Sequence, residues 1–132
     1  MTSSATIRID IAHGELVDKI TILEIKNERM TDPAKLANVR AEMAVLVAAR
    51  GEGMAPSPEL AALTAELKSI NESLWEIEDE IRDCERRKDF GPRFIELARA
   101  VYKTNDRRSD VKRRISALCG AAFNEEKSYQ AY

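Results

Sequence analysis

An arginine and a tyrosine on one predicted helical face are the first residues of this chain that could perform recognition chemistry. Arg99, Tyr102 and Asp106 are spaced i, i+3 and i+7, and Lys103 and Arg107 lie beside them. Arginine can donate two parallel hydrogen bonds to a carboxylate or phosphate, and a tyrosine hydroxyl can add another. This face is therefore a candidate site for an anionic metabolite such as a sugar nucleotide.

A larger ligand-binding site would form if the preceding helix and the C-terminal tail face the same side chains. The predicted ligand-binding residues are Glu76, Asp79, Arg82, Arg99, Tyr102, Arg107, Lys127 and Tyr129. In the alternative interpretation, Arg99 forms an ion pair with Glu76 or Glu80 of the preceding helix. Tyr102 would then only cover the edge of the core.

Paired carboxylates at i, i+3 suggest a second kind of chemistry. All-α nucleotide pyrophosphatases bind magnesium through such pairs, because carboxylate oxygens suit hard cations. The pairs in this chain are Glu15/Asp18, Glu76/Asp79 and Glu80/Asp83. With 23 acidic residues among 132, chance alone gives about as many. We therefore interpret the acidic residues as a solvated helix face, and we predict no metal site and no cofactor.

The elements that would position these residues follow from an apolar repeat. Between residues 60 and 84 a large apolar residue or a cysteine occupies every position of a 3-4 repeat: Leu60, Leu63, Leu67, Ile70, Leu74, Ile77, Ile81 and Cys84. Such a stripe is buried only against other helices. The predicted fold is all-α, an antiparallel helical bundle with a long coiled-coil-like helix pair.

Turn residues divide this single domain into segments. Asp32-Pro33 and Ser57-Pro58 each combine a capping side chain with a proline at the first helical position. We predict an extended N-terminal arm over 1–13, a helical hairpin over 14–50, a linker over 51–58, a long helix pair over 59–119 and a tail over 120–132.

Several residues leave alternatives open. Asn105 lies on the apolar stripe of the last helix, which is either continuous or broken there. Trp75 lies off the main stripe and either packs on the hairpin or forms one wall of a pocket. Ile7, Ile9 and Ile11 alternate with polar or small residues, so the arm needs a partner, such as a second subunit.

Charge and composition narrow the class of protein. Residues 86–114 contain 11 basic and 4 acidic residues, although the whole chain has a net charge of −2. The basic stretch could bind phosphate groups, or it could pair with acidic residues of the same fold or of a partner. The overall acidity and the lack of a nucleic-acid motif argue against DNA or RNA. Cys84 and Cys119 are interpreted as buried apolar residues in a reducing compartment.

Four stretches resemble a small bacterial domain family of unknown function. They are GELVDKITILEIK (14–26), LWEIEDEIRDCE (74–85), FIELARAVYKTNDRRSDVKRRI (94–115) and EEKSY (125–129). Members stand alone or occur beside glycosyltransferase-like and tetratricopeptide-repeat proteins. The resemblance implies a setting in surface-glycan assembly, and it supplies no activity, cofactor or catalytic residue.

Two functions follow as expectations. The first is a non-catalytic interaction or accessory module in the bacterial cytoplasm, which self-associates because its apolar surface exceeds what one small bundle covers. The second is a small helical enzyme or binding protein for an anionic metabolite, at the ligand-binding residues given above. No nucleophile signature, glycine-rich phosphate loop or membrane-spanning segment is present in the sequence, and whether the chain is an enzyme stays open.

Overall fold

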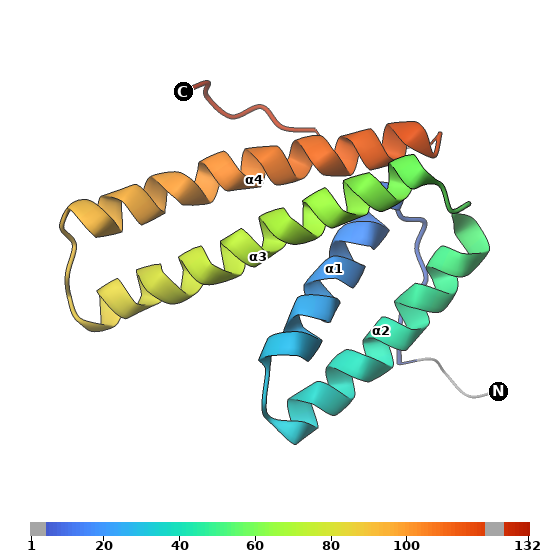
Figure 1. The fold of residues 1–132 in the computed structure, drawn as a ribbon, viewed down its shortest axis with the longest axis horizontal. Helices are drawn as coiled ribbons and strands as arrows, with labels where there is room; N and C mark the ends of the chain where they lie inside the picture. The colour runs from blue at the N-terminus through green and yellow to red at the C-terminus, as the bar shows by residue number, and fades with distance from the viewer. Residues whose placement is uncertain (1–4, 121–125) are drawn as a thin grey trace.

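The computed structural model describes residues 5–120 and 126–132, and over these residues it contains four helices and no strand. They are α1 (His13–Arg29), α2 (Pro33–Gly53), α3 (Pro58–Arg86) and α4 (Pro92–Leu118). Figure 1 shows α3 and α4 side by side as a long pair, with the shorter α1–α2 hairpin projecting from it. The all-α prediction is confirmed.

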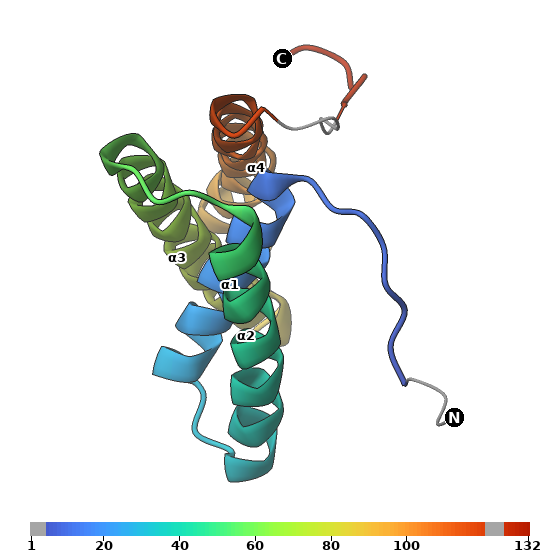
Figure 2. The same ribbon diagram turned by 90° about the vertical axis from the view of Figure 1, so that its right-hand side faces the viewer.

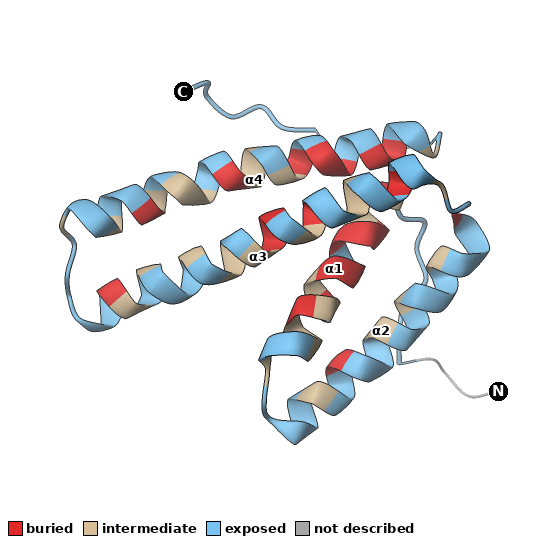
Figure 3. Ribbon diagram, in the orientation of Figure 1, coloured by how far each residue is buried: buried red, intermediate tan, exposed pale blue. Residues whose placement is uncertain are grey.

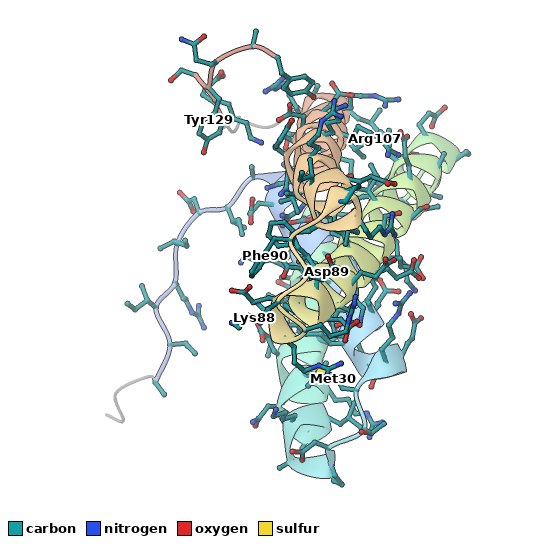
Figure 4. The ribbon with its side chains drawn as sticks, turned by 90° about the vertical axis from the view of Figure 1, so that its left-hand side faces the viewer. Met30, Lys88, Asp89, Phe90, Arg107 and Tyr129 are labelled. Atoms are coloured by element: carbon teal, nitrogen blue, oxygen red, sulfur yellow. The ribbon has the colours of Figure 1, made fainter. Side chains whose placement is uncertain are left out.

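Local signals start and stop the helices much as the sequence predicts. The Asp32 side chain accepts a hydrogen bond from the Ala34 amide at 2.9 Å, and Ser57 Oγ accepts one from the Leu60 amide at 3.0 Å. After α3, Lys88 adopts a left-handed conformation with φ 56° and turns the chain toward α4 (Figure 4). The linker is shorter than predicted, because α2 continues through residues 51–53.

The 3-4 stripe of α3 is covered as expected. Leu60, Leu67, Ile70 and Cys84 are buried, and the other four stripe residues are partly buried. Full burial of a leucine or isoleucine side chain contributes about 1.5–3 kcal/mol, so this stripe supplies much of the stability. α4 is continuous through Asn105, and Thr104 and Ser109 on either side of it are buried.

The hairpin helices are covered unequally, as Figure 3 shows. α1 packs against α2, α3 and α4, and Val17, Ile20 and Ile25 are almost fully buried. α2 packs only on α1 among the helices described, and Val39 is its one buried apolar residue in the core set. Val47 of α2 is exposed, because α2 presents only one narrow face to α1.

The N-terminal arm forms no strand within its described residues. It leaves the start of α1 and runs away from the helices (Figure 2). Ile7 is 89% exposed and Ile9 is 76% exposed, so these two isoleucines are largely uncovered by their own chain.

The cysteines are free thiols, and no disulfide joins them. Cys84 is buried, whereas Cys119 is only partly buried against the core. Burial raises the pKa of the Cys119 thiol, which favours its protonated form over the thiolate. Along the described chain no helix is both long and apolar enough to span a bilayer.

Candidate functional site: a charged junction between two cavities

A buried carboxylate lies where α1, α3 and α4 meet. Asp18 of α1 is only 1% exposed. Arg108 of α4 binds it through two donors, with Nε 2.9 Å from Oδ1 and Nη2 2.5 Å from Oδ2. Asn71 of α3 donates to the same Oδ1 at 2.9 Å. Three helices are therefore joined at one side chain, and this two-pronged geometry is the strongest form of an arginine–carboxylate pair.

Neighbouring polar groups complete the junction. Asn71 Nδ2 also donates to Thr21 Oγ1 at 3.0 Å, and the Thr21 hydroxyl donates to the Asp18 carbonyl oxygen at 2.8 Å. Lys112 Nζ lies 2.7 Å from Glu15 and 4.0 Å from Asp18. Because an unpaired buried charge is very costly, these contacts allow the Asp18 carboxylate and the Lys112 ammonium to remain buried.

A glycine brings α1 close enough to α4 to build this junction. A Cβ atom on Gly14 would lie 2.0 Å from the Lys112 carbonyl oxygen and 2.9 Å from Ser116 Oγ. With hydrogen in its place, the Gly14 amide instead donates to Ser116 Oγ at 3.0 Å. The lack of a side chain at this position therefore sets the distance between the two helices.

The first cavity opens between α1, α3 and α4 on one side of the junction and has a volume of about 560 Å³. Its apolar wall consists of Trp75 and aliphatic residues of all three helices, and its polar groups include Asn71, Asp79 and Arg108. The complete lining is Ile22, Ile25, Asn71, Leu74, Trp75, Glu78, Asp79, Arg82, Val101, Asn105 and Arg108. Trp75 thus forms part of the wall of this cavity, as one of the two alternatives predicted, and Ile22 and Ile25 of the hairpin line the same cavity.

The second cavity, of about 400 Å³, lies between α4 and the tail. Tyr102 and Lys112 of α4 line it together with Lys127 and Tyr129. The Lys127 ammonium is 3.6 Å from the Asp106 carboxylate. The Tyr132 ring packs on Tyr102 with centroids 5.3 Å apart, and a hydrogen bond to Asp106 raises the pKa of Tyr132. The described part of the tail thus lies over α4.

The predicted ligand-binding residues do not converge on one site. Asp79 and Arg82 line the first cavity, whereas Tyr102, Lys127 and Tyr129 line the second. The other three, Glu76, Arg99 and Arg107, are exposed and line neither of these cavities. Figure 4 shows Arg107 and Tyr129 on different sides of α4.

The predicted ion pair of Arg99 is not formed. Glu76 lies 3.5 Å from Arg29 of α1, and Glu80 accepts a hydrogen bond of 3.0 Å from Arg93. Among the described residues, Arg99 has no ion-pair partner. Arg99 is exposed, and the acidic residues of α3 pair with arginines at other positions.

The predicted acidic pairs are bound mainly to basic side chains. Glu15 and Asp18 contact Lys112, and Glu80 contacts Arg93. Asp83 accepts hydrogen bonds from Arg86 and Arg87, which lower its carboxyl pKa. Over residues 5–120 and 126–132, no group of three or more His, Cys, Asp or Glu side chains is placed to hold a metal.

Polar residues on apolar helix faces are the sequence signal for this junction, and the spacing of surface charges does not reveal it. Asp18 and Thr21 stand within the apolar stripe of α1, and Asn71 stands between stripe residues of α3. A carboxylate or amide on an apolar face must find a partner when the face is buried. Polar residues on apolar stripes were therefore better indicators than clusters of surface charge.

Comparison with known proteins gives a family and no activity. A family model described as "Family of unknown function (DUF6165)" matches residues 7–132. This chain belongs to that family. The match includes every described residue of the junction and of both cavities. No curated protein and no solved structure matches the chain.

Proposed function

We propose that this protein is a non-catalytic interaction module that self-associates through its N-terminal arm. The observation that carries the proposal is the exposure of Ile7 and Ile9 on a segment that leaves its own helices. Each isoleucine exposes apolar area whose burial is worth about 25 cal/mol per Å². The described residues of the arm before α1 also belong to no helix and no sheet.

The occupant that fits the arm is a second copy of this chain. Beyond α1, an open groove of about 480 Å³ lies between the end of α2 and the start of α3. Its floor is formed by small or apolar residues, among them Met54, Leu60 and Ala61, and charged residues also line it. The groove contains both signs of charge, on Glu24, Arg50 and Lys68. The arm also contains both signs, on Arg8 and Asp10.

Arm exchange would therefore match apolar with apolar and charge with charge. The isoleucines of one copy would enter the groove of another, while Arg8 and Asp10 would face its charged residues. Reciprocal exchange gives a closed two-fold dimer, the commonest symmetry of soluble oligomers. Two grooves would then be filled without any change in the helices.

The experiment is sedimentation equilibrium of the full chain with Ile9→Asp as the test variant. The wild type should form a dimer at micromolar concentrations, and Ile9→Asp should shift the equilibrium at least tenfold toward monomer. Ile95→Asp is the control, because Ile95 of α4 is another exposed isoleucine, 55% exposed, and it does not line the groove. It should leave the dimer unchanged.

Cross-linking locates the contact. In a Cys84→Ser/Cys119→Ser background, Ile9→Cys on one copy and Ala61→Cys on another should form an intermolecular disulfide when the two proteins are mixed. A strictly monomeric wild type would overturn the proposal, as would equal effects of Ile9→Asp and Ile95→Asp.

The biological setting that we propose rests on the resemblance to a bacterial domain family described above. No contact in the described structure bears on it. We extend the proposal to an accessory role beside surface-glycan assembly in the bacterial cytoplasm. Deleting the gene should then change the composition of the cell-surface polysaccharide, and the Ile9→Asp variant should fail to restore it. Unchanged polysaccharide in the deletion strain would contradict this extension and leave the self-association test intact.

A further inference from the structure

The first cavity combines an aromatic wall with two carboxylates, two amides and two guanidinium groups. Trp75 is the chain's only tryptophan, and it lines the cavity with Ile22 and Ile25 of α1. The volume of about 560 Å³ lies within the range typical of small-molecule sites. Self-association through the arm does not involve this cavity, so the two are independent.

The charges that line the cavity are not balanced. The Arg108 guanidinium is held by the buried Asp18 carboxylate. The Arg82 guanidinium donates to Glu78 at 3.0 Å, which neutralises a second cation. Asp79, one helical turn after Trp75, has no ion-pair partner among the described residues. The cavity is therefore left with one uncompensated negative charge.

The buried amide at the back of the cavity also offers an acceptor. Both hydrogen bonds that Asn71 Nδ2 can donate are used, one to Asp18 and one to Thr21. The side-chain oxygen of Asn71 can therefore still accept a hydrogen bond from a ligand. A ligand that enters between Trp75 and Asn71 thus meets an aromatic side chain, an oxygen acceptor and a carboxylate.

We propose that this cavity binds an organic monocation, meaning an ammonium or guanidinium group on a short apolar stem. Cations are attracted to the face of tryptophan, and Asp79 supplies the opposite charge. The aliphatic side chains would cover the stem. An anionic metabolite would instead meet Asp79 without a free cation to offset it, so this site has the opposite preference from the anion site predicted on α4.

Trp75 fluorescence provides the test on the intact protein. Titration with n-butylammonium chloride should give a saturable change, with a Kd on the order of 1 mM for so small a probe. Sodium butyrate and butanol, which share the stem without the positive charge, should give none. N-acetyltryptophanamide under the same conditions measures collisional quenching, which must be subtracted.

Two variants that each remove one negative charge from α3 distinguish a contact inside the cavity from the general electrostatic effect of the helix. Asp79→Asn should weaken n-butylammonium binding about tenfold. Glu85→Gln removes the same charge from an exposed position outside the cavity and should leave binding unchanged. Equal effects of the two variants, tighter binding of butyrate, or no saturable signal would each overturn the proposal.

The same titration identifies the source of the cation. Free n-butylammonium and a capped tripeptide, acetyl-Gly-Lys-Gly-amide, present the same charged group on a metabolite-like stem and on a peptide. Tighter binding of the peptide assigns the site to a lysine or arginine of a protein partner. Tighter binding of the free amine assigns it to a small metabolite.

Discussion

Asp18 has no solvent to stabilise its charge, so its neighbours must do so. Arg108 and Asn71 provide three hydrogen bonds to its carboxylate, and Lys112, which is 9% exposed at its side chain, adds a cation nearby. Replacing such a group with well-packed apolar residues is often neutral in stability, whereas removing one member alone is costly. The junction therefore fixes which faces of α1, α3 and α4 meet.

We expect Asp18→Ala to lower the free energy of unfolding by about 3 kcal/mol, because Arg108 would lose the carboxylate that binds two of its donors. Urea denaturation followed by circular dichroism measures this change. Asp110→Ala is the control, since Asp110 pairs with Arg114 at the surface with 61% of its side chain exposed. Its effect should stay within about 0.5 kcal/mol. Similar losses for both variants would contradict the assigned role of the junction.

The spacing between α1 and α4 depends on the glycine at position 14. We expect Gly14→Ala to destabilise the protein by about 2 kcal/mol or more, because the added Cβ collides with the α4 backbone and α1 must shift. Thermal and urea unfolding measure the loss, and the Trp75 emission should also change, since α1 forms one wall of its cavity.

Gly51→Ala provides the opposite expectation with the same chemical change. Gly51 lies within α2, and no atom lies within 4 Å of its ideal Cβ position. Alanine there should stabilise the protein by about 0.5–1 kcal/mol, because glycine is unfavourable inside a helix. If the two alanine variants shift stability in the same direction, the close approach of α1 to α4 is not what Gly14 provides.

Across the whole molecule, opposite charges are distributed over adjacent helices. α3 contains nine acidic and three basic residues, whereas α4 contains eight basic and three acidic residues. Arg93 pairs with Glu80 and Arg114 lies 3.6 Å from Glu66, so both ends of the long pair are bridged. The basic stretch recognised in the sequence is therefore partly used within the fold.

We expect sodium chloride to lower the urea midpoint of unfolding slightly, because these bridges are exposed and salt screens them. The double variant Arg93→Gln/Arg114→Gln should show a smaller decrease over the same salt range, whereas Arg99→Gln/Arg107→Gln, which removes equal charge from α4, should behave like the wild type. A midpoint that rises with salt in all three proteins would contradict this account.

Local patterns were sufficient to predict the helices. The 3-4 stripe of α3 and the Asp32-Pro33 and Ser57-Pro58 caps depend only on residues close in sequence, and the structure confirms them. The stripe also predicted burial, because an apolar helix face has to be covered. Whether α4 bends at Asn105 was left open, since a single polar residue on the stripe is compatible with either structure.

The sequence by itself determined that this chain is helical, where its main helices begin, and which stripes they bury. Only the tertiary structure decided that Asp18 meets Arg108, 90 residues away, and that Arg99 and Arg107 lie outside the cavities. Periodicity specifies a face of each helix, but the angle and depth at which helices cross depend on contacts such as that of Gly14 with α4. Those contacts set which polar side chains converge, and hence where a ligand could bind.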